Sequence, residues 1–261
     1  MNDIVAAFHE YFEVIHADTP RLQHEVFRVR YQVLCIEQRL PGFDVARYPD
    51  GCERDSYDDH SSHVLLLHRP SGGFVGTARL ILPDLNHPKK LYPLELHTQL
   101  DPLLFDPSSL PRQHTAEVSR LLIMRRFRQR REDNGKLEDS MVVEERGVKK
   151  QRRFPHPMLA LVVGLISMSA ERNITHWISI MDPALNRLLS LYGLQHDPIG
   201  PITEHHGQRR PYHVDVTSML DRMYVHHKQI WELLTDYGRV RPNFDPTARG
   251  PLSAISVPSN P

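Results

Sequence analysis

Apolar and polar positions change their period along the chain, and the changes predict a mixture of strands and helices. Short apolar or alternating runs predict six strands, over residues 12–16, 63–67, 74–82, 115–124, 175–181 and 211–216. Apolar periodicity, one long apolar run and capping residues predict four helices, over residues 19–34, 157–172, 183–192 and 218–236. Strands that precede and then alternate with helices favour an α/β fold, with a mixed sheet covered by helices on both faces.

Capping residues mark several of the expected helix boundaries. Asp18 or Thr19 stands where the N-cap of the first helix belongs, and Pro20 follows in the first turn. Asp182 is the expected N-cap of the third helix, and Gly193 stands where a glycine commonly ends a helix.

The chain shows no internal repeat and no linker in its middle, so we expect residues 1–240 to form one domain. Residues 83–113 are polar and interrupted by prolines, and residues 125–153 form a highly charged insertion. The tail, residues 241–261, is rich in Pro, Ser and Gly and is expected to be poorly ordered.

Composition narrows the classes of protein. The 32 basic and 32 acidic residues cancel, so no overall field favours binding to nucleic acid or to a membrane surface. Two cysteines, Cys35 and Cys52, are too few for a disulfide framework and are expected to be reduced. The first residues do not resemble a signal peptide, and the most apolar stretch, 158–168, is too short for a membrane span. We therefore expect a cytoplasmic protein without integral membrane association.

Several common catalytic motifs are absent from the sequence. There is no P-loop, no G-x-G-x-x-G, no G-x-S-x-G and no C-x-x-C. The histidine pairs 205–206 and 226–227 lack the spacing of a helical metal site, so no metal is expected.

Charged and polar residues stand inside two apolar strands. Arg79 lies within one of them, and Glu117, Ser119 and Arg120 lie within another. A charge in a core strand is costly unless it is paired, so these residues belong either to structural ion pairs or to a functional site. This second strand alternates in part, with Glu117, Ser119 and Leu121 expected on one face and Val118, Arg120 and Leu122 on the other.

The loop before the second predicted strand carries an acidic cluster, made of Glu53, Asp55, Asp58 and Asp59. Its spacing alone is typical of a solvated loop. It lacks the glycine and the terminal glutamate of an EF-hand calcium loop.

Four short motifs follow one another along the chain: residues 30–40 (RYQVLCIEQRL), 53–58 (E-x-D-x-Y-D), 76–80 (GTARL) and 117–120 (EVSR). In this order they resemble the autoinducer (acyl-homoserine-lactone) synthases and their relatives among N-acyl amino acid synthases. The resemblance is closest to the acyltransferases associated with the PEP-CTERM/exosortase system. It extends over residues 21–216, which is most of the chain.

This resemblance implies a GNAT fold, in which a mixed, twisted sheet has two splayed strands that admit the arm of a thioester. It implies an acyl-carrier-protein phosphopantetheine thioester or an acyl-CoA as donor, with no permanently bound cofactor. The family's substrate-side residues correspond to Arg30, Asp55, Asp58 and Arg79. Its motif on the central strand corresponds to Glu117, Ser119 and Arg120.

Transfer of an acyl group to an amine requires a base for the amine proton and donors for the thioester oxygen. Glu117 is the expected general base, and the backbone N–H groups of Leu121 and Leu122 are the expected oxyanion donors. Ser119 is expected to orient the leaving thiol or the pantetheine arm.

The arginines have two open interpretations. Arg79 and Arg120 either bind a substrate carboxylate or hold Asp55 and Asp58 by bidentate pairs, and Arg30 joins the same network. No covalent acyl-enzyme is required, although Cys35 is the one nucleophile near a motif.

Two departures from the synthases bear on the acceptor. Leu34 replaces an aromatic residue and Leu40 replaces a tryptophan, both of which help to shape the amine side in those enzymes. An amino acid or another small amine is therefore favoured over homoserine lactone production. The alternatives are an autoinducer synthase and a non-catalytic GNAT-like module that binds an acyl thioester.

The insertion 125–153 holds eleven basic and six acidic residues, which leaves a local charge of +5. It fits docking of an acidic carrier protein, although a solvated flexible loop is the simpler interpretation. A nucleic-acid binder using residues 125–131 (RRFRQRR) is disfavoured by the neutral overall charge. Residues 158–168 and 177–181 are candidates to line an acyl tunnel, or else belong to the plain core.

Overall fold

The computed structural model describes residues 2–88, 90–128, 156–204 and 206–242. Their strands form one sheet in the order β1-β2-β3-β4-β5-β8-β6, and β7 pairs with β8. The strands are β1 (Phe12–His16), β2 (Ser61–His68), β3 (Gly73–Ile81), β4 (Thr115–Ile123), β5 (His176–Met181), β6 (Asp197–Pro198), β7 (Thr203–Glu204) and β8 (Gln208–Asp215). The pairing of β4 with β5 is parallel, and the other pairings among these strands are antiparallel. The predicted mixed sheet is confirmed.

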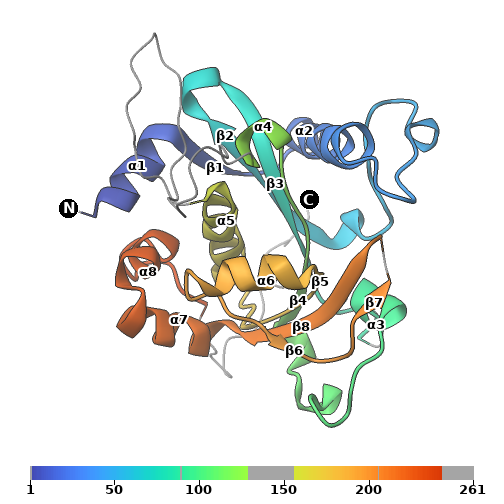
Figure 1. Cartoon of the computed structure of the whole chain (residues 1–261), viewed down its shortest axis with the longest axis vertical. Helices are drawn as coiled ribbons and strands as arrows, with labels where there is room; N and C mark the ends of the chain where they lie inside the picture. The colour runs from blue at the N-terminus through green and yellow to red at the C-terminus, as the bar shows by residue number, and fades with distance from the viewer. Residues whose placement is uncertain (1, 89, 129–155, 205, 243–261) are drawn as a thin grey trace, which may run out of the picture.

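Helices cover both faces of this sheet (Figure 1). They are α1 (Asp3–Tyr11), α2 (Pro20–Tyr31), α3 (Pro93–His97), α4 (Arg125–Arg128), α5 (Pro157–Glu171), α6 (Pro183–Ser190), α7 (Val216–His226) and α8 (Lys228–Leu234). A π-helical segment, Gln32–Glu37, continues α2. The six predicted strands are all present with ends within three residues of the prediction, whereas α1, α3, β6 and β7 were not predicted.

The local capping signals are confirmed. The side chain of Thr19 accepts a hydrogen bond from the backbone N–H of Leu22, and Pro20 begins α2. Asp182 caps α6 in the same way, and Gly193 follows with a φ of 83°.

The single helix predicted over residues 218–236 is wrong, because two helices occupy this region and meet at His227. His227 has φ −136° and ψ 47°, which no helix accommodates. Its ring packs on Gly193, where an added Cβ would lie 2.6 Å from the ring. A tertiary contact therefore breaks a pattern that is locally helical.

Two hydrophobic clusters lie on opposite faces of the sheet. The larger one packs α5 against alternate residues of the strands, among them Val64 and Leu66 of β2. The smaller one packs α2 against the other face, where Leu65 meets Val26 and Val29. In Figure 1, α5 lies over the middle of the sheet, with α7 and α8 beside it.

A third cluster lies on the α2 face of the sheet, at the end where β3 stops and β4 starts. Its buried members are Ile81, Tyr92, Leu94, Ile178 and Ile199. The first turn of α3 thus packs on β3 and β5, which places α3 directly above the beginning of β4.

A bulge interrupts β4 at Arg120. The ladder pairs Arg79 with Ser119 and Thr77 with Leu122, so that two residues of β4 face one residue of β3. Arg120 has a φ of 51°, in the left-handed region that few residues other than glycine adopt.

The bulge reverses the side chains that follow it. Val118 and Leu121 both pack against the large cluster beside α5, whereas Leu122 packs in the cluster beside α2. The expected faces are therefore wrong for Arg120, which shares a face with Glu117, and for Leu121 and Leu122. The physical reason is the one extra residue, which shifts the two-residue period of the strand by one position.

Strands β4 and β5 pair over a short distance and then separate. Their parallel ladder joins residues 115–117 to residues 176–178. Beyond it, β4 continues to Ile123 and β5 to Met181 without pairing to each other. Glu117 is therefore the last residue of β4 in this ladder.

Other expectations have mixed outcomes. Cys35 and Cys52 are both free and buried, as expected for reduced packing residues.

Most of the charged insertion and nearly all of the tail lie outside the described residues, and the assignment of residues 1–240 to one domain stays a prediction. Within the described part of the chain, no helix is long and apolar enough to cross a membrane.

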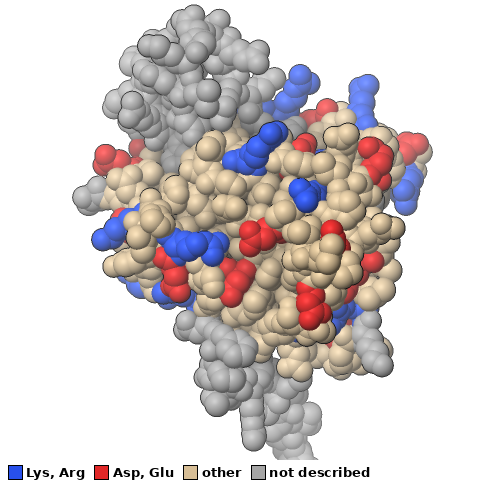
Figure 2. Space-filling view, turned by 60° about the horizontal axis from the view of Figure 1, so that its bottom comes forward, with Lys and Arg blue, Asp and Glu red and all other residues tan. Residues whose placement is uncertain are grey.

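Charged side chains are mixed on the surface. Figure 2 shows acidic and basic residues interspersed over one face, separated by uncharged residues. The described residues of this face thus form no extended basic patch for a nucleic acid.

Candidate active site

Three arginines and three acids meet between α2 and the sheet. They are Arg30 of α2, Arg79 of β3, Arg120 of β4, and Glu53, Asp55 and Asp58 of the loop before β2. We call this set the ion cluster. Its formal charges cancel, as burial of so many charges requires.

Arg30 is the most buried member of the ion cluster, with no exposed surface. Its Nε donates to Glu53, and its Nη1 lies 2.6 Å from Oδ1 of Asp58. Its guanidinium also lies over the ring of Phe27, at 5.4 Å from the ring centre. Arg30 thus fixes α2 to the acidic loop.

Arg79 connects this loop to the sheet. Its Nη1 donates to Asp55 at 2.6 Å and to Asp58 at 2.8 Å. Its Nε donates to the hydroxyl of Ser119 at 2.9 Å. The hydroxyl of Ser119 is therefore engaged as an acceptor next to the bulge.

Arg120 closes the ion cluster from β4. Its Nη2 lies 2.9 Å from Oε1 of Glu53 and 3.1 Å from Oδ2 of Asp55. Its guanidinium also lies over the ring of Phe43, at 5.2 Å. These contacts explain the bulge, because a regular strand would direct this side chain to the opposite face.

Electrostatics keep the acids of the ion cluster ionised. Burial alone would raise the pKa of Glu53, but the charges of Arg120 and Arg30 hold it below its usual range. Burial likewise opposes ionisation of Asp55 and Asp58, and Arg79 and Arg30 respectively overcome it and lower the pKa of each. The prediction of a solvated acidic loop is therefore wrong for these three acids, because arginines distant in sequence neutralise them.

Two members of this region were not among the expected site residues. Glu53 is 1% exposed and bridges Arg30 and Arg120, yet only its place in the E-x-D-x-Y-D motif indicated a role. His63 of β2 lies 3.7 Å from Asp58, and burial lowers its pKa to about 4, so it is neutral. Its position in an apolar strand, facing the acidic loop, was the only available signal.

Glu117 lies beside the ion cluster but does not belong to it. It is 3% exposed, and its Oε2 accepts a hydrogen bond from the backbone N–H of Leu94 in α3 at 2.8 Å. Burial raises the pKa of Glu117 to about 8, even though Leu94, Arg79 and Arg120 act in the opposite direction. This carboxyl thus changes its protonation state near neutral pH, as a general acid–base group does.

Comparison with known proteins agrees with this topology. Residues 29–135 match the family model described as the acetyltransferase (GNAT) domain. An acyl-homoserine lactone synthase, BjaI, solved with SAM and isopentyl-CoA, is 20% identical, with a TM-score of 0.51 over 87% of this chain and 88% of that chain. The acyl-homoserine lactone synthase LasI is 16% identical, with a TM-score of 0.52 over 79% and 91%. The chain has a GNAT fold.

A third solved structure is more distant. FeeM, an N-acyl amino acid synthase from uncultured soil microbes, is 12% identical, with a TM-score of 0.46 over 80% of this chain and 93% of that chain. A search of curated protein sequences gives no significant match. The GNAT fold is thus shown, and the match to the acetyltransferase domain supports the expectation of an N-acyltransferase.

Within this GNAT fold, the two expected oxyanion donors lie at different points of the bulge. Leu122 faces Thr77 in the β3–β4 ladder, and Met124 donates its N–H to the carbonyl of Val75. Because alternate residues of an antiparallel strand point their N–H groups the same way, the amide of Leu122 is directed to β3. Leu121 lies in the bulge itself, where the ladder gives it no partner in β3.

Cys35 is poorly suited to act as a nucleophile in this GNAT fold. It is 3% exposed, in the π-helical segment after α2. Burial, together with the charge of Glu53, raises the pKa of its thiol. Leu34 is buried in the same segment, and its carbonyl accepts a hydrogen bond from the N–H of Leu40.

The residues proposed to line an acyl tunnel belong to the core. The described side chains from Leu159 to Met168 of α5 pack mainly in the large cluster, and so do Trp177 and Met181 of β5. The plain core interpretation therefore holds for these residues.

Among the described residues, no group of three His, Cys, Asp or Glu side chains is placed to hold a metal ion.

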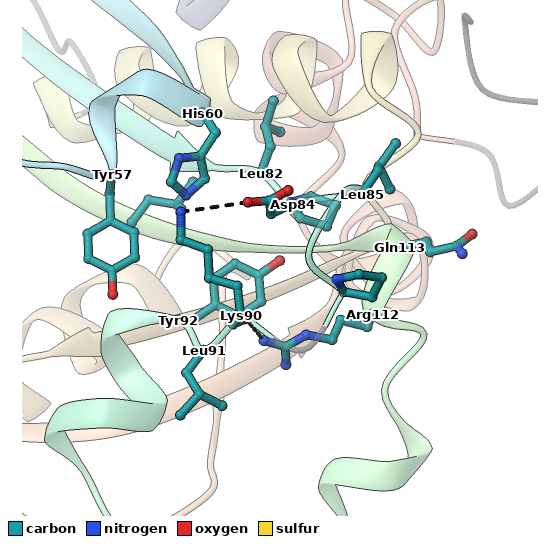
Figure 3. Close-up of a pocket in the computed structure, with 13 residues that line it drawn as sticks. Tyr57, His60, Leu82, Asp84, Leu85, Lys90, Leu91, Tyr92, Arg112 and Gln113 are labelled. Atoms are coloured by element: carbon teal, nitrogen blue, oxygen red, sulfur yellow. Dashed lines mark hydrogen bonds and ion pairs between the residues drawn. The ribbon is translucent and has the colours of Figure 1, made fainter.

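A hollow opens at the end of the sheet where β3 stops (Figure 3). It contains about 450 Å³ of empty space that is open to solvent. Its polar lining comes from Tyr57, His60, Asp84, Lys90, Arg112 and Gln113, and its apolar lining includes Ile81 and Tyr92. We call it the β3-end hollow.

Proposed function

We propose that this protein is an N-acyltransferase that moves a fatty acyl group from a thioester donor to the amine of an amino acid or similar small molecule. The observation that carries the proposal is the position of Glu117. Its pKa is raised to about 8, and it is the last residue of β4 in the ladder with β5. The GNAT fold and the match to the acetyltransferase domain support this assignment.

In the proposed reaction, the amine nitrogen attacks the thioester carbonyl and forms the new C–N bond. Glu117 takes the proton that the amine loses, directly or through a water, because an ammonium has no lone pair to attack with. The C–S bond then breaks, and the proton held by Glu117 passes, directly or through a water, to the departing thiolate, which leaves as a thiol and returns Glu117 to its ionised form. No covalent acyl-enzyme forms, in keeping with the burial of Cys35.

The proposed oxyanion donor is the backbone N–H of Leu121, with Leu122 as the less favourable of the two. Leu121 has no partner in the regular β3–β4 ladder, and its amide is proposed to donate to the thioester oxygen as charge develops there. A donor held by a strand needs little reorganisation during the reaction.

The ion cluster positions this bulge in the proposed mechanism. Arg79 holds Ser119, and Arg120 holds the acidic loop, so their first role is structural rather than recognition of substrate. Arg120 is 22% exposed in its side chain and is the arginine of the three best placed to reach a substrate as well. Ser119 remains our candidate to orient the leaving thiol.

Both kinds of donor fit the proposal. BjaI is a CoA-dependent synthase solved with isopentyl-CoA, which makes acyl-CoA a reasonable donor to test. A carrier-protein donor would dock on the basic insertion 125–153, of which only residues 125–128 are described. The proposal is therefore to be tested with both acyl-CoA and an acyl carrier protein as donor.

The acceptor follows from Leu34 and Leu40, which replace the aromatic residues of the autoinducer synthases. An amino acid is proposed on this basis, as in the N-acyl amino acid synthases that the sequence resembles. The second candidate is an acyl-homoserine lactone synthase, which is favoured by the structural similarity to BjaI and LasI.

The test is mass spectrometry of lipids from bacteria that overexpress either the wild type or Glu117→Gln. New masses of a fatty acyl group plus an amino acid, absent with the variant, are the expected result. Acyl-homoserine lactones would support the second candidate. A purified protein that binds acyl-CoA but acylates none of a panel of amines would instead favour a non-catalytic thioester-binding module.

A further inference from the structure

The β3-end hollow lies next to Glu117. Ile81 lines the hollow and faces Glu117 in the β3–β4 ladder. Tyr92 also lines it, and its hydroxyl donates to the carbonyl of Thr115 at 2.7 Å. Two residues later, the N–H of Leu94 donates to the Glu117 carboxylate. One wall of the hollow therefore continues to the group that is proposed to take the amine proton.

The position of the hollow also suits an acceptor that approaches Glu117 from the side opposite the thioester donor. Strands β4 and β5 separate beyond Glu117, toward Ile123 and Met181, and this is where the thioester arm enters in the proposed reaction. The hollow lies at the opposite end of β4, near Thr115. Donor and acceptor would thus reach Glu117 from opposite sides, as direct transfer between them requires.

Lys90 is the cation of the hollow with the longer ion pair. Its Nζ lies 3.7 Å from Oδ2 of Asp84, which is longer than a hydrogen bond, and 5.9 Å from the ring centre of Tyr57. An ammonium has three N–H donors, so it can bind an anion without leaving Tyr57. In Figure 3, the Lys90 ammonium lies between His60 and Asp84.

The other charges of the hollow are already engaged. Arg112 pairs with Glu95 through two contacts of 2.9 and 3.0 Å and also donates to the carbonyl of Lys90. Asp84 accepts hydrogen bonds from the N–H groups of Asn86 and His87, both at 3.1 Å. Of the two cations that line the hollow, Lys90 is therefore the less tightly engaged, and it keeps N–H donors for an anion.

We infer that the β3-end hollow binds the carboxylate of the acyl acceptor, with the Lys90 ammonium as its partner; this deepens the proposed function and rests on it. His60 and Tyr57 offer further hydrogen-bond donors beside Lys90, and Ile81 and Tyr92 contact the apolar part of the acceptor. The acceptor class is thus an amine that carries a carboxylate, held with its amine toward Glu117.

Binding is tested without catalysis, by calorimetry with a panel of amino acids and the corresponding amides. We expect at least one amino acid to bind the wild type about tenfold more tightly than its amide, which lacks the negative charge. Lys90→Met should remove this preference, and Lys90→Arg should restore part of it. Because Lys90 is exposed, neither change threatens the fold.

The matched control is Lys228→Met. Lys228 is also an exposed lysine beside a tyrosine, with its Nζ 5.7 Å from the ring centre of Tyr224, but it belongs to α8 and is not part of the hollow. It should bind amino acids as the wild type does. The inference is overturned if no amino acid binds the wild type, if amides bind equally well, or if Lys90→Met leaves the preference intact.

Acylation of the same panel separates this inference from the proposed function. Binding that depends on Lys90, without acylation of any amine by any thioester, would contradict the proposed function alone. Acylation of amino acids by Lys90→Met with an unchanged KM for the amino acid would contradict the role of Lys90 alone.

Discussion

The carboxylate of Glu117 accepts a hydrogen bond of 2.8 Å from the backbone N–H of Leu94, the second residue of the five-residue helix α3. This contact attaches the loop region between β3 and β4 to the strand that carries the proposed base. It also places a carboxyl group of pKa about 8 beneath a short helix that the sequence did not predict.

The raised pKa of Glu117 predicts how stability depends on pH. Between pH 4.5 and about 8 the folded state holds a proton that the unfolded state has released, so the stability of the wild type falls as pH rises. Glu117→Gln keeps a hydrogen-bond acceptor for Leu94 but cannot ionise. Its advantage in unfolding free energy should grow with pH across this window, at about 1.4 kcal/mol per pH unit at most.

Urea denaturation of both proteins at pH 5, 6.5 and 8 measures this difference. A difference that stays constant with pH would contradict the raised pKa. In activity assays, kcat/KM of the wild type should rise through about pH 8, and Glu117→Gln should lose about two to four orders of magnitude.

Arg30 should be essential for stability because it has no exposed surface and neutralises two acids. Arg30→Met leaves Glu53 and Asp58 with one arginine each, at a cost of about 3–5 kcal/mol. Arg28→Met is the control on the same helix, because Arg28 is 60% exposed and its pair with Glu25 should be worth under about 1 kcal/mol. Thermal or chemical denaturation at pH 7 measures both changes.

The stability cost of Arg30→Met should depend on pH, because Glu53, Asp55 and Asp58 are ionisable. Their pKa values are lowered in the folded state, so the stability that they contribute is present above about pH 4 and lost as pH falls further. The cost of Arg30→Met should therefore shrink as the acids become protonated. A cost that is the same at pH 3.5 and pH 7 would show that packing, not charge, is the main contribution of Arg30.

Arg120 combines a strained backbone with an ion pair, and two substitutions separate them. At a φ of 51°, glycine is less strained than alanine, so Arg120→Gly should be more stable than Arg120→Ala by about 1 kcal/mol. Both variants lose the pairs with Glu53 and Asp55 and should lose activity to a similar extent. Equal stability of the two variants would argue against the left-handed conformation at this position.

Ser179 offers a stabilising substitution. Its hydroxyl lies on β5 immediately after the ladder with β4 ends, it is 5% exposed in the residue as a whole, and it has no hydrogen-bond partner within the described structure. Ser179→Ala removes this unsatisfied group and should raise the unfolding free energy by about 1 kcal/mol. A rise in melting temperature is the measurement, and a fall would reveal a partner for this hydroxyl.

Much of the fold followed from local sequence rules. The strands, the long helix α5 and the caps at Thr19 and Asp182 depend on residues that are near one another in sequence. Arg30, Asp55, Asp58 and Arg79 also meet in one network of ion pairs, as one of the two interpretations of the arginines expected. Local periodicity is sufficient for the strands and caps, because each depends on a few neighbouring residues, and the motifs indicated which distant charged residues to compare.

The tertiary structure alone decided the bulge at Arg120, the burial of Glu53 and the break at His227. Arg120 and Glu53 are 67 positions apart, so no local pattern reports that they pair, and only this pair explains why β4 departs from alternation. In the same way, the separation of β4 from β5 and the cover of α3 over Glu117 create the dry surroundings that raise its pKa. The sequence by itself determined which groups are present, and the packing of distant segments determined their charge state and their geometry, because desolvation depends on everything that surrounds a group.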